Sequence, residues 1–182
     1  MNTGSRMWNS DDNLYLIGFM ASGKTTVGRK LAEKSRRRFF DTDEIIAMKA
    51  GQTIAEIFTE RGEADFRQVE SEVVAEVAKE RKAIVALGGG AILLQQNWLT
   101  LDKTGITIYL KRDLAAILPR MVSNGLRPLI YGNHNSKRRR IEELFRSREG
   151  LYERARYTVA CHEPMTPEHV SERILEILGY NQ

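Results

Sequence analysis

The sequence has a single cysteine and lacks the features that mark secreted or membrane proteins. Because Cys161 stands alone among 182 residues, no disulfide can form within the chain, and a reducing, cytoplasmic setting is expected. The longest apolar stretch, residues 83–94, is interrupted by three glycines and is too short to span a bilayer. Residues 1–13 are polar and lack the apolar core of a signal peptide, so we expect a disordered tail there.

An excess of charge of one sign is also largely missing, since the net charge is only +4. Such a small excess favours anionic partners in general and does not select nucleic acid. Two basic runs, residues 36–38 and 137–140, have no interleaved aromatic pattern beside them that would support RNA binding. The simpler interpretation is a helix end and a solvated helix face. We therefore expect no nucleic-acid partner. We also expect a monomer without a membrane partner.

Short apolar runs alternate with helical patterns along the chain. The helical patterns are clearest over residues 24–35 and 170–178, while residues 45–80 are helical in patches with breaks near Gly51 and Gly62. This alternation predicts an α/β fold in which helices cover both faces of a parallel sheet. The five predicted strands are residues 14–17, 38–41, 83–87, 107–110 and 157–160.

Residues 18–25 match the P-loop pattern G-x-x-x-x-G-K-[ST] in full, and they lie between a predicted strand and a predicted helix. Gly18 and Gly23 let the backbone curl so that its N–H groups point at phosphate oxygens. Lys24 supplies a positive charge for the phosphates, and the Thr25 hydroxyl can bind Mg²⁺. GTPases, ATPases and kinases all carry this motif, so it leaves the reaction open. The predicted nucleotide-binding residues here are Gly18, Ala21, Ser22, Gly23, Lys24, Thr25 and Thr26.

Two aspartates, Asp41 and Asp43, come at the end of the second predicted strand. Ligands of open α/β sheets bind at the carboxyl ends of the strands, so both side chains could face the phosphate loop. One carboxylate could then hold Mg²⁺ through water while the other accepts a hydrogen bond from an attacking hydroxyl. The alternative is that Thr42 or Asp43 only caps the following helix.

Two further clusters have both a structural and a functional interpretation. Arg67 and Glu70 lie three residues apart on one helix face, which is typical of a surface ion pair. Alternatively, Glu70 holds the guanidinium of Arg67 toward a carboxylate ligand. Three consecutive glycines, Gly88, Gly89 and Gly90, follow the third strand and indicate either a tight turn or a close approach of the backbone to a ligand.

Taken in this order, the motifs resemble those of the shikimate kinase family, and the resemblance covers nearly the whole chain. It includes Arg127-Pro128-Leu129 and an arginine, Arg148, four residues before Tyr152. The resemblance implies one P-loop kinase domain over residues 14–182, with a five-stranded parallel sheet flanked by helices. It also implies a substrate-binding helical segment at about 42–80 and a mobile lid at about 123–136.

The resemblance further implies ATP-dependent phosphorylation of the 3-hydroxyl of shikimate, with Mg²⁺, in aromatic amino-acid biosynthesis. Asp41 and Thr25 are then expected near the metal, and Asp43 is expected to bind the shikimate hydroxyls and orient or receive the proton. The implied catalytic residues are Lys24, Asp43 and Arg127. The implied acceptor site, in which Arg67 and Arg148 grip the carboxylate, consists of Asp43, Arg67, Glu70, Gly88, Gly89, Gly90 and Arg148. The implied nucleotide contacts outside the P-loop are Arg120, Arg127 and Pro167.

Two features depart from the family pattern. Ala21 stands where the family more often has glycine, and we expect its methyl group to be tolerated because Gly18 and Gly23 still supply the turns. The basic run at 137–140 has no place in the family's chemistry. Alternative functions are a kinase for a related acid such as aminoshikimate or gluconate, an inactive ATP-binding relative, and an RNA-associated NTPase.

Overall fold

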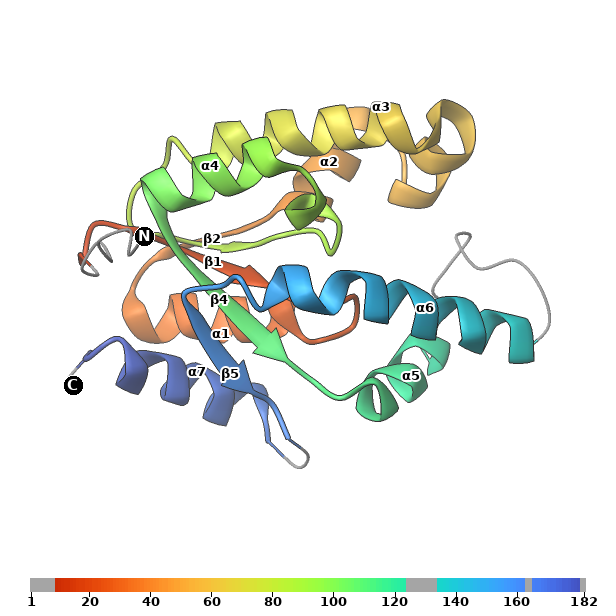
Figure 1. Cartoon of the computed structure of the whole chain (residues 1–182). Coiled ribbons are helices and arrows are strands. Elements are labelled where there is room, and N and C mark those ends of the chain that lie inside the picture. The colour runs from red at the N-terminus through yellow and green to blue at the C-terminus, as the bar shows by residue number, and fades with distance from the viewer. Residues whose placement is uncertain (1–8, 124–133, 163–164, 181–182) are drawn as a thin grey trace, which may run out of the picture.

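The computed structural model describes residues 9–123, 134–162 and 165–180, and its centre is a five-stranded sheet (Figure 1). The strand order is β2-β3-β1-β4-β5, and every pair of neighbours is parallel. All five strands therefore end at the same edge of the sheet, which confirms the predicted α/β fold class. In chain order they are β1 (Asn13–Ile17), β2 (Arg38–Asp41), β3 (Ala83–Ala86), β4 (Gly105–Lys111) and β5 (Tyr157–Ala160).

Helices cover both faces of the sheet. Figure 1 shows α1 and α7 on one side and α3, α4 and α6 on the other. This is the layered arrangement that short, fully buried strands require. The helices are α1 (Lys24–Ser35), α2 (Thr42–Ala50), α3 (Ile54–Val77), η1 (Ala91–Leu93), α4 (Gln95–Thr104), α5 (Leu114–Ser123), α6 (His134–Tyr152) and α7 (Pro167–Ile177).

The central strand β1 shows how the core forms. Its side chains alternate between the faces of the sheet, as in any strand. Tyr15 and Ile17 pack with residues of α3, α4 and α6, whereas Leu14 and Leu16 pack with residues of α1 and α7. Since all four are at most 1% exposed, β1 is buried on both faces and anchors the loop that follows it.

The predicted helix breaks are confirmed at both glycines. Gly51 ends α2 in the left-handed conformation, with a φ of 62°. Gly62 interrupts α3 with a φ of 79° and a ψ of 175°, which is not helical. The kink at Gly62 brings the rings of Phe58 and Phe66 within 4.3 Å of each other, centroid to centroid. These two rings form part of the site described below.

Strand β1 begins at Asn13, one residue before the predicted start of the kinase domain at residue 14. Asn13 begins β1 and is fully buried, and its side chain accepts a hydrogen bond from the Ala83 N–H and donates one to the Glu80 carbonyl. Asp12 is also buried, and its carboxylate accepts a hydrogen bond from the Asn9 N–H. The end of the predicted tail is therefore joined to the sheet.

The two basic runs have structural positions that match the simpler interpretation. Arg36 ends α1, and Arg37 donates hydrogen bonds to Tyr180 and to the Asp12 carbonyl. In the second run, residues 138–140 are exposed along α6. Of the predicted lid, residues 124–133 lie outside the described part of the chain, while the backbone of residues 134–136 belongs to the first turn of α6.

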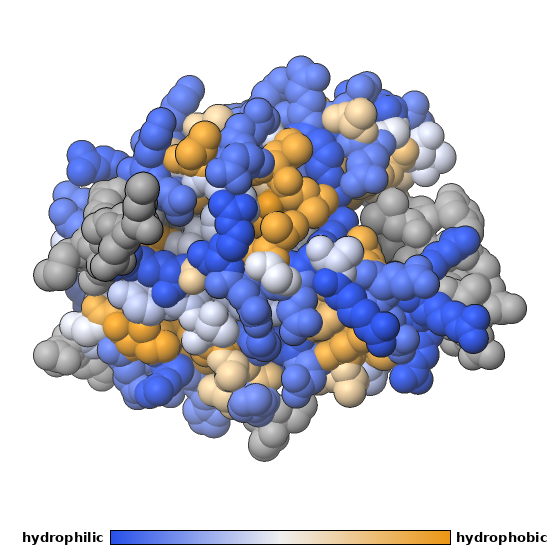
Figure 2. Space-filling model, in the orientation of Figure 1, coloured by the Kyte–Doolittle hydropathy of each residue, from blue (hydrophilic) through white to orange (hydrophobic). Residues whose placement is uncertain are grey.

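The surface is mainly hydrophilic on the face that Figure 2 presents, with apolar residues visible in smaller groups among the charged ones. Within the described ranges, no helix is both long and apolar enough to cross a bilayer.

Candidate active site

The P-loop connects β1 to α1 and turns sharply at three positions. Gly18, Ala21 and Gly23 have φ angles of 147°, 60° and 98°. A side chain on Gly18 would also meet the Leu110 carbonyl and the Ser22 hydroxyl at 3.0 Å. Successive turns of this kind aim backbone N–H groups into one concave surface, which suits an anion. The loop ends at Lys24, where the positive end of the α1 dipole adds to the attraction for phosphate.

Ala21 is the unusual member of this loop. Its left-handed backbone conformation costs a residue with a side chain about 1–2 kcal/mol. Gly18 and Gly23 supply turns as expected, and Ala21 makes a further turn in spite of its methyl group. The surrounding loop keeps this conformation in spite of the strain, and the residue lines a small pocket beside the loop.

Lys24 and the other predicted P-loop contacts lie on the inner side of the loop and at the start of α1. The Lys24 ammonium donates hydrogen bonds to the Gly18 and Phe19 carbonyls, at 2.9 and 3.0 Å. Ser22 is buried, and its hydroxyl has no hydrogen-bond partner among the described residues. Thr26, by contrast, is exposed in the first turn of α1.

Thr25 and Asp41 come together at the predicted metal position. The Thr25 hydroxyl donates a 2.6 Å hydrogen bond to Oδ2 of Asp41, which is 8% exposed. Magnesium is commonly held by one or two carboxylates together with phosphates and water, so a hydroxyl and a carboxylate beside a phosphate loop fit this ion. Within the described residues no group of three or more His, Cys, Asp or Glu side chains could hold a metal ion.

Asp41 also caps the helix that follows it. Its Oδ1 accepts hydrogen bonds from the backbone N–H groups of Asp43 and Glu44, at 3.0 and 3.4 Å. The cap is therefore Asp41 and neither Thr42 nor Asp43, which were the capping candidates of the sequence. With the cap supplied by Asp41, Asp43 stands in the first turn of α2 and lines the pocket.

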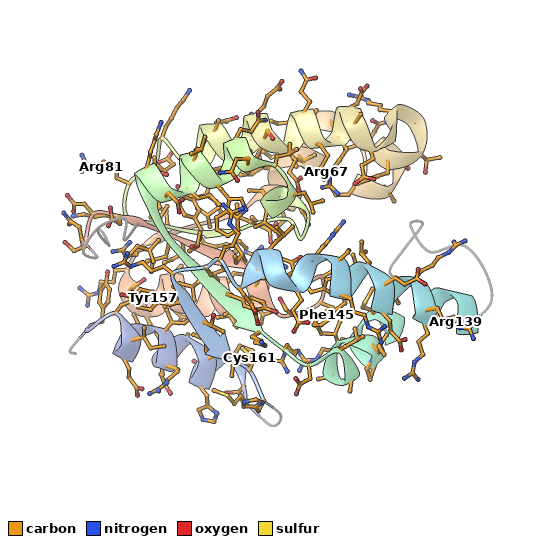
Figure 3. The ribbon with its side chains drawn as sticks, viewed as in Figure 1. Arg67, Arg81, Arg139, Phe145, Tyr157 and Cys161 are labelled. Carbon is orange, nitrogen blue, oxygen red and sulfur yellow. The ribbon has the colours of Figure 1, made fainter. Side chains whose placement is uncertain are left out.

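A cavity of about 140 Å³ lies between the P-loop, α3, the loop after β3 and α6. Figure 3 shows Arg67 pointing from α3 toward the space above α6. The lining contains both signs of charge beside an apolar wall, an arrangement suited to a small ligand with an anionic group and several hydroxyls. Its charged members are Lys24, Asp43, Arg67, Glu70 and Arg148. Its apolar members include Met20, Ile54, Phe58 and Leu144.

Arg67 and Glu70 form a buried pair. The side chains are 13% and 1% exposed, and Arg67 Nη1 lies 2.7 Å from Glu70 Oε2. The guanidinium also bonds Glu63 at 2.9 Å, and it lies 5.6 and 5.2 Å from the ring centroids of Phe58 and Phe66. An ion pair this buried is unlike the exposed pairs that contribute little, because a lost partner would leave an uncompensated charge. The geometry thus favours the functional interpretation of this cluster over the surface pair.

Glu70 has an altered affinity for protons. Burial raises the pKa of its carboxyl, and the negative charge of Asp43 adds to that effect, while Arg67 and Arg148 oppose it. Four charged groups from three helices therefore act on one another in this pocket.

Two of the three glycines after β3 have no room for a side chain. A Cβ on Gly88 would lie 2.5 Å from Asp43 Oδ1 and 2.8 Å from Glu70 Oε1. A Cβ on Gly90 would lie 2.2 Å from Arg67 Nη1. The groups that approach Gly88 and Gly90 closely are charged side chains of the protein itself, and an approach of this backbone to a ligand stays a prediction.

Arg148 reaches the same loop from α6. It is 8% exposed, and its Nη1 donates a 3.4 Å hydrogen bond to the Gly89 carbonyl. Its Nε is buried without a hydrogen-bond partner among the described residues. Arg67 and Arg148 thus face one pocket from α3 and α6, as predicted for a carboxylate clamp.

Sequence reasoning assigned no role to three residues that shape this site. Thr42 accepts a 2.8 Å hydrogen bond from the Gly88 N–H, Tyr152 donates one to the Gly89 carbonyl, and Phe58 contacts Arg67. The sequence did carry a signal for Tyr152, because it lies four residues after Arg148 and residues four apart on a helix share a face.

Of the three predicted nucleotide contacts outside the P-loop, the structure describes Arg120 and Pro167. Arg120 is half-buried in α5, and Pro167 is the first residue of α7. Burial raises the pKa of Cys161, which follows β5, and the nearby charges of Arg112 and Arg120 oppose the increase. Arg120 is therefore close to the segment between β5 and α7. Arg127 lies outside the described residues.

A P-loop beside a small pocket with arginines on two walls, on a parallel sheet of order β2-β3-β1-β4-β5, defines a P-loop kinase of small molecules. Comparison with known proteins makes the class more specific, since the family model for shikimate kinase matches residues 20–179. The chain belongs to the shikimate kinase family, whose reaction is the ATP-dependent phosphorylation of shikimate.

Individual shikimate kinases match this chain over nearly their whole length. Shikimate kinase of Trichormus variabilis is 38% identical over 91% of this chain and 90% of its own. Shikimate kinase of Thermodesulfovibrio yellowstonii is 37% identical over 90% of this chain and 93% of its own. The solved shikimate kinase of Acinetobacter baumannii, in complex with shikimate, has a TM-score of 0.86 at 35% identity and covers 94% of both chains. A gluconokinase from Sinorhizobium meliloti, at 16% identity and a TM-score of 0.58, shares the fold.

Proposed function

We propose that this chain transfers the γ-phosphoryl group of ATP to the 3-hydroxyl of shikimate, giving shikimate 3-phosphate and ADP for aromatic amino-acid biosynthesis. The observation that carries the proposal is the pocket itself, because Arg67 and Arg148 line it together with Lys24 of the P-loop. A donor site and an acceptor site thus share one cavity, as direct in-line transfer requires.

The acceptor is held through its carboxylate. Arg67 and Arg148 form the two arms of the clamp, since a guanidinium binds a carboxylate through paired hydrogen bonds. Glu70 holds Arg67 in place from its buried position, and the rings of Phe58 and Phe66 limit the guanidinium's movement. The pocket lining has more positive than negative side chains, because Glu70 and Asp43 balance only part of the positive charge. The negative charge of the acceptor carboxylate then offsets the remainder.

The reacting hydroxyl is placed by Asp43. This carboxylate lines the pocket beside Lys24, and its Oδ1 lies close to the backbone of Gly88. It accepts a hydrogen bond from the hydroxyl and so turns the oxygen toward the phosphoryl group. Because the attacking oxygen of a loose transition state keeps its proton late, orientation accounts for much of this residue's contribution.

The donor is held by the P-loop, with Thr25 and Asp41 holding Mg²⁺ beside it. When bound, the ion neutralises charge on the phosphates. The Lys24 ammonium then exchanges its hydrogen bonds to the Gly18 and Phe19 carbonyls for bonds to the β- and γ-phosphates. A charged phosphate oxygen is a stronger acceptor for an ammonium group than a neutral carbonyl is. In this proposal Arg127, which lies outside the described residues, contacts the phosphates, and Arg120 and Pro167 contact the adenine.

We also propose that the enzyme acts as a monomer in the cytoplasm without a nucleic-acid partner. The positions of the two basic runs support the last of these points, because Arg37 is used within the fold and residues 138–140 form a solvated helix face.

A phosphoryl-transfer assay tests the proposal. The acceptors should be shikimate, aminoshikimate, shikimate methyl ester and gluconate, each with ATP and Mg²⁺, and a parallel reaction should contain RNA. We expect rapid turnover with shikimate, poor turnover with the ester and gluconate, and no stimulation by RNA. A rate with gluconate or with the ester equal to that with shikimate would overturn the assignment of the acceptor.

A further inference from the structure

Tyr152 occupies a position where three parts of the site meet. It is the last residue of α6 and is fully buried, and its hydroxyl donates a 2.6 Å hydrogen bond to the Gly89 carbonyl. The backbone of Gly89 faces the P-loop, since a Cβ placed there would lie 3.5 Å from the Met20 nitrogen and 3.7 Å from the Gly18 carbonyl. One side chain therefore joins the end of α6 to a loop that lies beside the P-loop and lines the acceptor pocket.

The carbonyls on either side of this contact are held differently. The Gly88 carbonyl accepts a hydrogen bond from the Ala91 N–H at 3.1 Å, and the Gly90 carbonyl accepts one from the Leu93 N–H at 2.9 Å. The carbonyl between them accepts hydrogen bonds from two side chains of α6, those of Tyr152 and Arg148. The position of the middle glycine thus depends on α6 and not only on its own loop.

The two bonds to this carbonyl are unequal. The Tyr152 bond measures 2.6 Å, whereas Arg148 Nη1 lies 3.4 Å away, at the long end of the hydrogen-bonding range. If the hydroxyl were removed, the charged guanidinium would be the remaining donor, and charge-assisted hydrogen bonds are the stronger ones. Arg148 would then be drawn toward Gly89 and away from an acceptor carboxylate.

The ring of Tyr152 is well placed to fix its hydroxyl. It stacks on Tyr109 of β4, with ring centroids 5.3 Å apart and an interplanar angle of 21°. Burial raises the pKa of Tyr152, so the phenol stays protonated and remains a donor over the physiological pH range.

We propose that Tyr152 is a positioning residue for the acceptor: its hydroxyl holds the Gly89 carbonyl and thereby leaves Arg148 available to the shikimate carboxylate. The inference rests on the proposed function, in which Arg148 is one arm of the clamp. In this inference Tyr152 affects acceptor binding through Arg148 and does not itself contact the acceptor.

The test is Tyr152→Phe, with Tyr109→Phe as the matched control. The Tyr109 hydroxyl is buried in the same ring stack and has no hydrogen-bond partner among the described residues, so its loss controls for removal of a buried phenol. We expect Tyr152→Phe to lower kcat/KM for shikimate by about threefold to tenfold, as for one neutral hydrogen bond, mainly through KM and with KM for ATP unchanged. Tyr109→Phe should leave both KM values unchanged.

Two outcomes would overturn the inference. One is a KM for shikimate in Tyr152→Phe equal to that of the wild type or of Tyr109→Phe. The other appears in a double-mutant cycle with Arg148→Ala, measured by shikimate binding in the presence of ADP. If Tyr152 acts through Arg148, the tyrosine substitution should cause little further loss in that background, whereas fully additive losses would refute this route. Failure of the wild-type enzyme to phosphorylate shikimate would instead refute the proposed function.

Discussion

Asp41 joins the phosphate loop to the helix that begins the acceptor site. One of its carboxylate oxygens accepts a 2.6 Å hydrogen bond from the Thr25 hydroxyl, and the other caps α2. The two tasks of this carboxylate differ in their need for charge. Capping requires only an acceptor oxygen, and asparagine supplies it as well as aspartate. Magnesium binding beside phosphates benefits from the full negative charge.

This difference allows the two aspartates to be separated by experiment. Asp41→Asn should keep nearly the wild-type free energy of unfolding but need more Mg²⁺, and added Mg²⁺ should restore part of its activity. Asp41→Ala should in addition lose about 1 kcal/mol of stability, because the cap is removed. Mg²⁺ titrations of activity and urea denaturation measure the two effects.

Asp43→Asn should behave differently from Asp41→Asn. It should turn over about 10²–10⁴-fold more slowly at every Mg²⁺ concentration, because the hydroxyl loses its orienting carboxylate. The same Mg²⁺ dependence in both asparagine variants would show that the roles of the two residues are divided wrongly.

Lys24→Ala should reduce turnover by about 10²–10³-fold or more while the fold remains intact, since it removes a charge that acts on the transferring phosphates. Lys30→Ala is a suitable control, because Lys30 lies on the same helix and pairs with Glu33 at the surface. Steady-state rates and circular dichroism provide the comparison. If Lys24→Ala kept more than about a tenth of the wild-type rate, the ammonium would not act at the phosphates.

Arg67→Ala should weaken the use of shikimate by about 2–5 kcal/mol in kcat/KM, as expected for the loss of one partner of a desolvated charge pair, with little change in ATP affinity. Arg61→Ala is the matched control, because this arginine is exposed on the same helix and bonds Gln52. With shikimate methyl ester the two variants should differ far less, since the ester presents no carboxylate to the clamp. A large difference that persists with the ester would contradict the clamp.

The raised pKa of Glu70 predicts a pH dependence of stability. Burial raises this pKa above its ordinary value of 4.5, so the folded state binds the proton more tightly than the unfolded state does. The contribution of Glu70 to the free energy of unfolding is therefore complete below 4.5 and is lost as the pH rises through the folded-state pKa. Relative to Glu70→Gln, which cannot ionise, the wild type should lose stability over this interval. Urea denaturation from about pH 4 to 8 measures it; a relative gain would show that Arg67 lowers the pKa instead.

Ala21→Gly should relieve the strain of a left-handed alanine. Removal of about 1–2 kcal/mol of strain is partly offset by the greater entropy of glycine in the unfolded chain, so the net gain should be at most about 1 kcal/mol. Thermal unfolding and denaturant titration measure it. A clear loss of stability would mean that the methyl group makes packing contacts that outweigh the strain.

Much of the fold and the site could be predicted from local sequence. The P-loop is contiguous, the strands are short apolar runs, and the breaks at Gly51 and Gly62 follow from the conformational freedom of glycine. Arg67 and Glu70 were recognisable because their spacing puts them on one helix face.

Contacts between distant parts of the chain were not accessible in this way. The hydrogen bond from Tyr152 to Gly89 joins residues 63 positions apart, and no periodicity in either segment indicates it. The burial of the Arg67–Glu70 pair likewise depends on the kink that brings Phe58 against Phe66. Helix α4 was not predicted because its segment, with several polar residues, buries only part of its length.

The central place of β1 has a consequence for how such enzymes diversify. Helix α6 belongs to the connection between β4 and β5, yet its Arg148 lines the acceptor pocket together with residues of the segments that follow β2 and β3. The pocket therefore draws on both sides of β1, so a lineage that came to accept another alcohol would have to change side chains on both sides of the central strand.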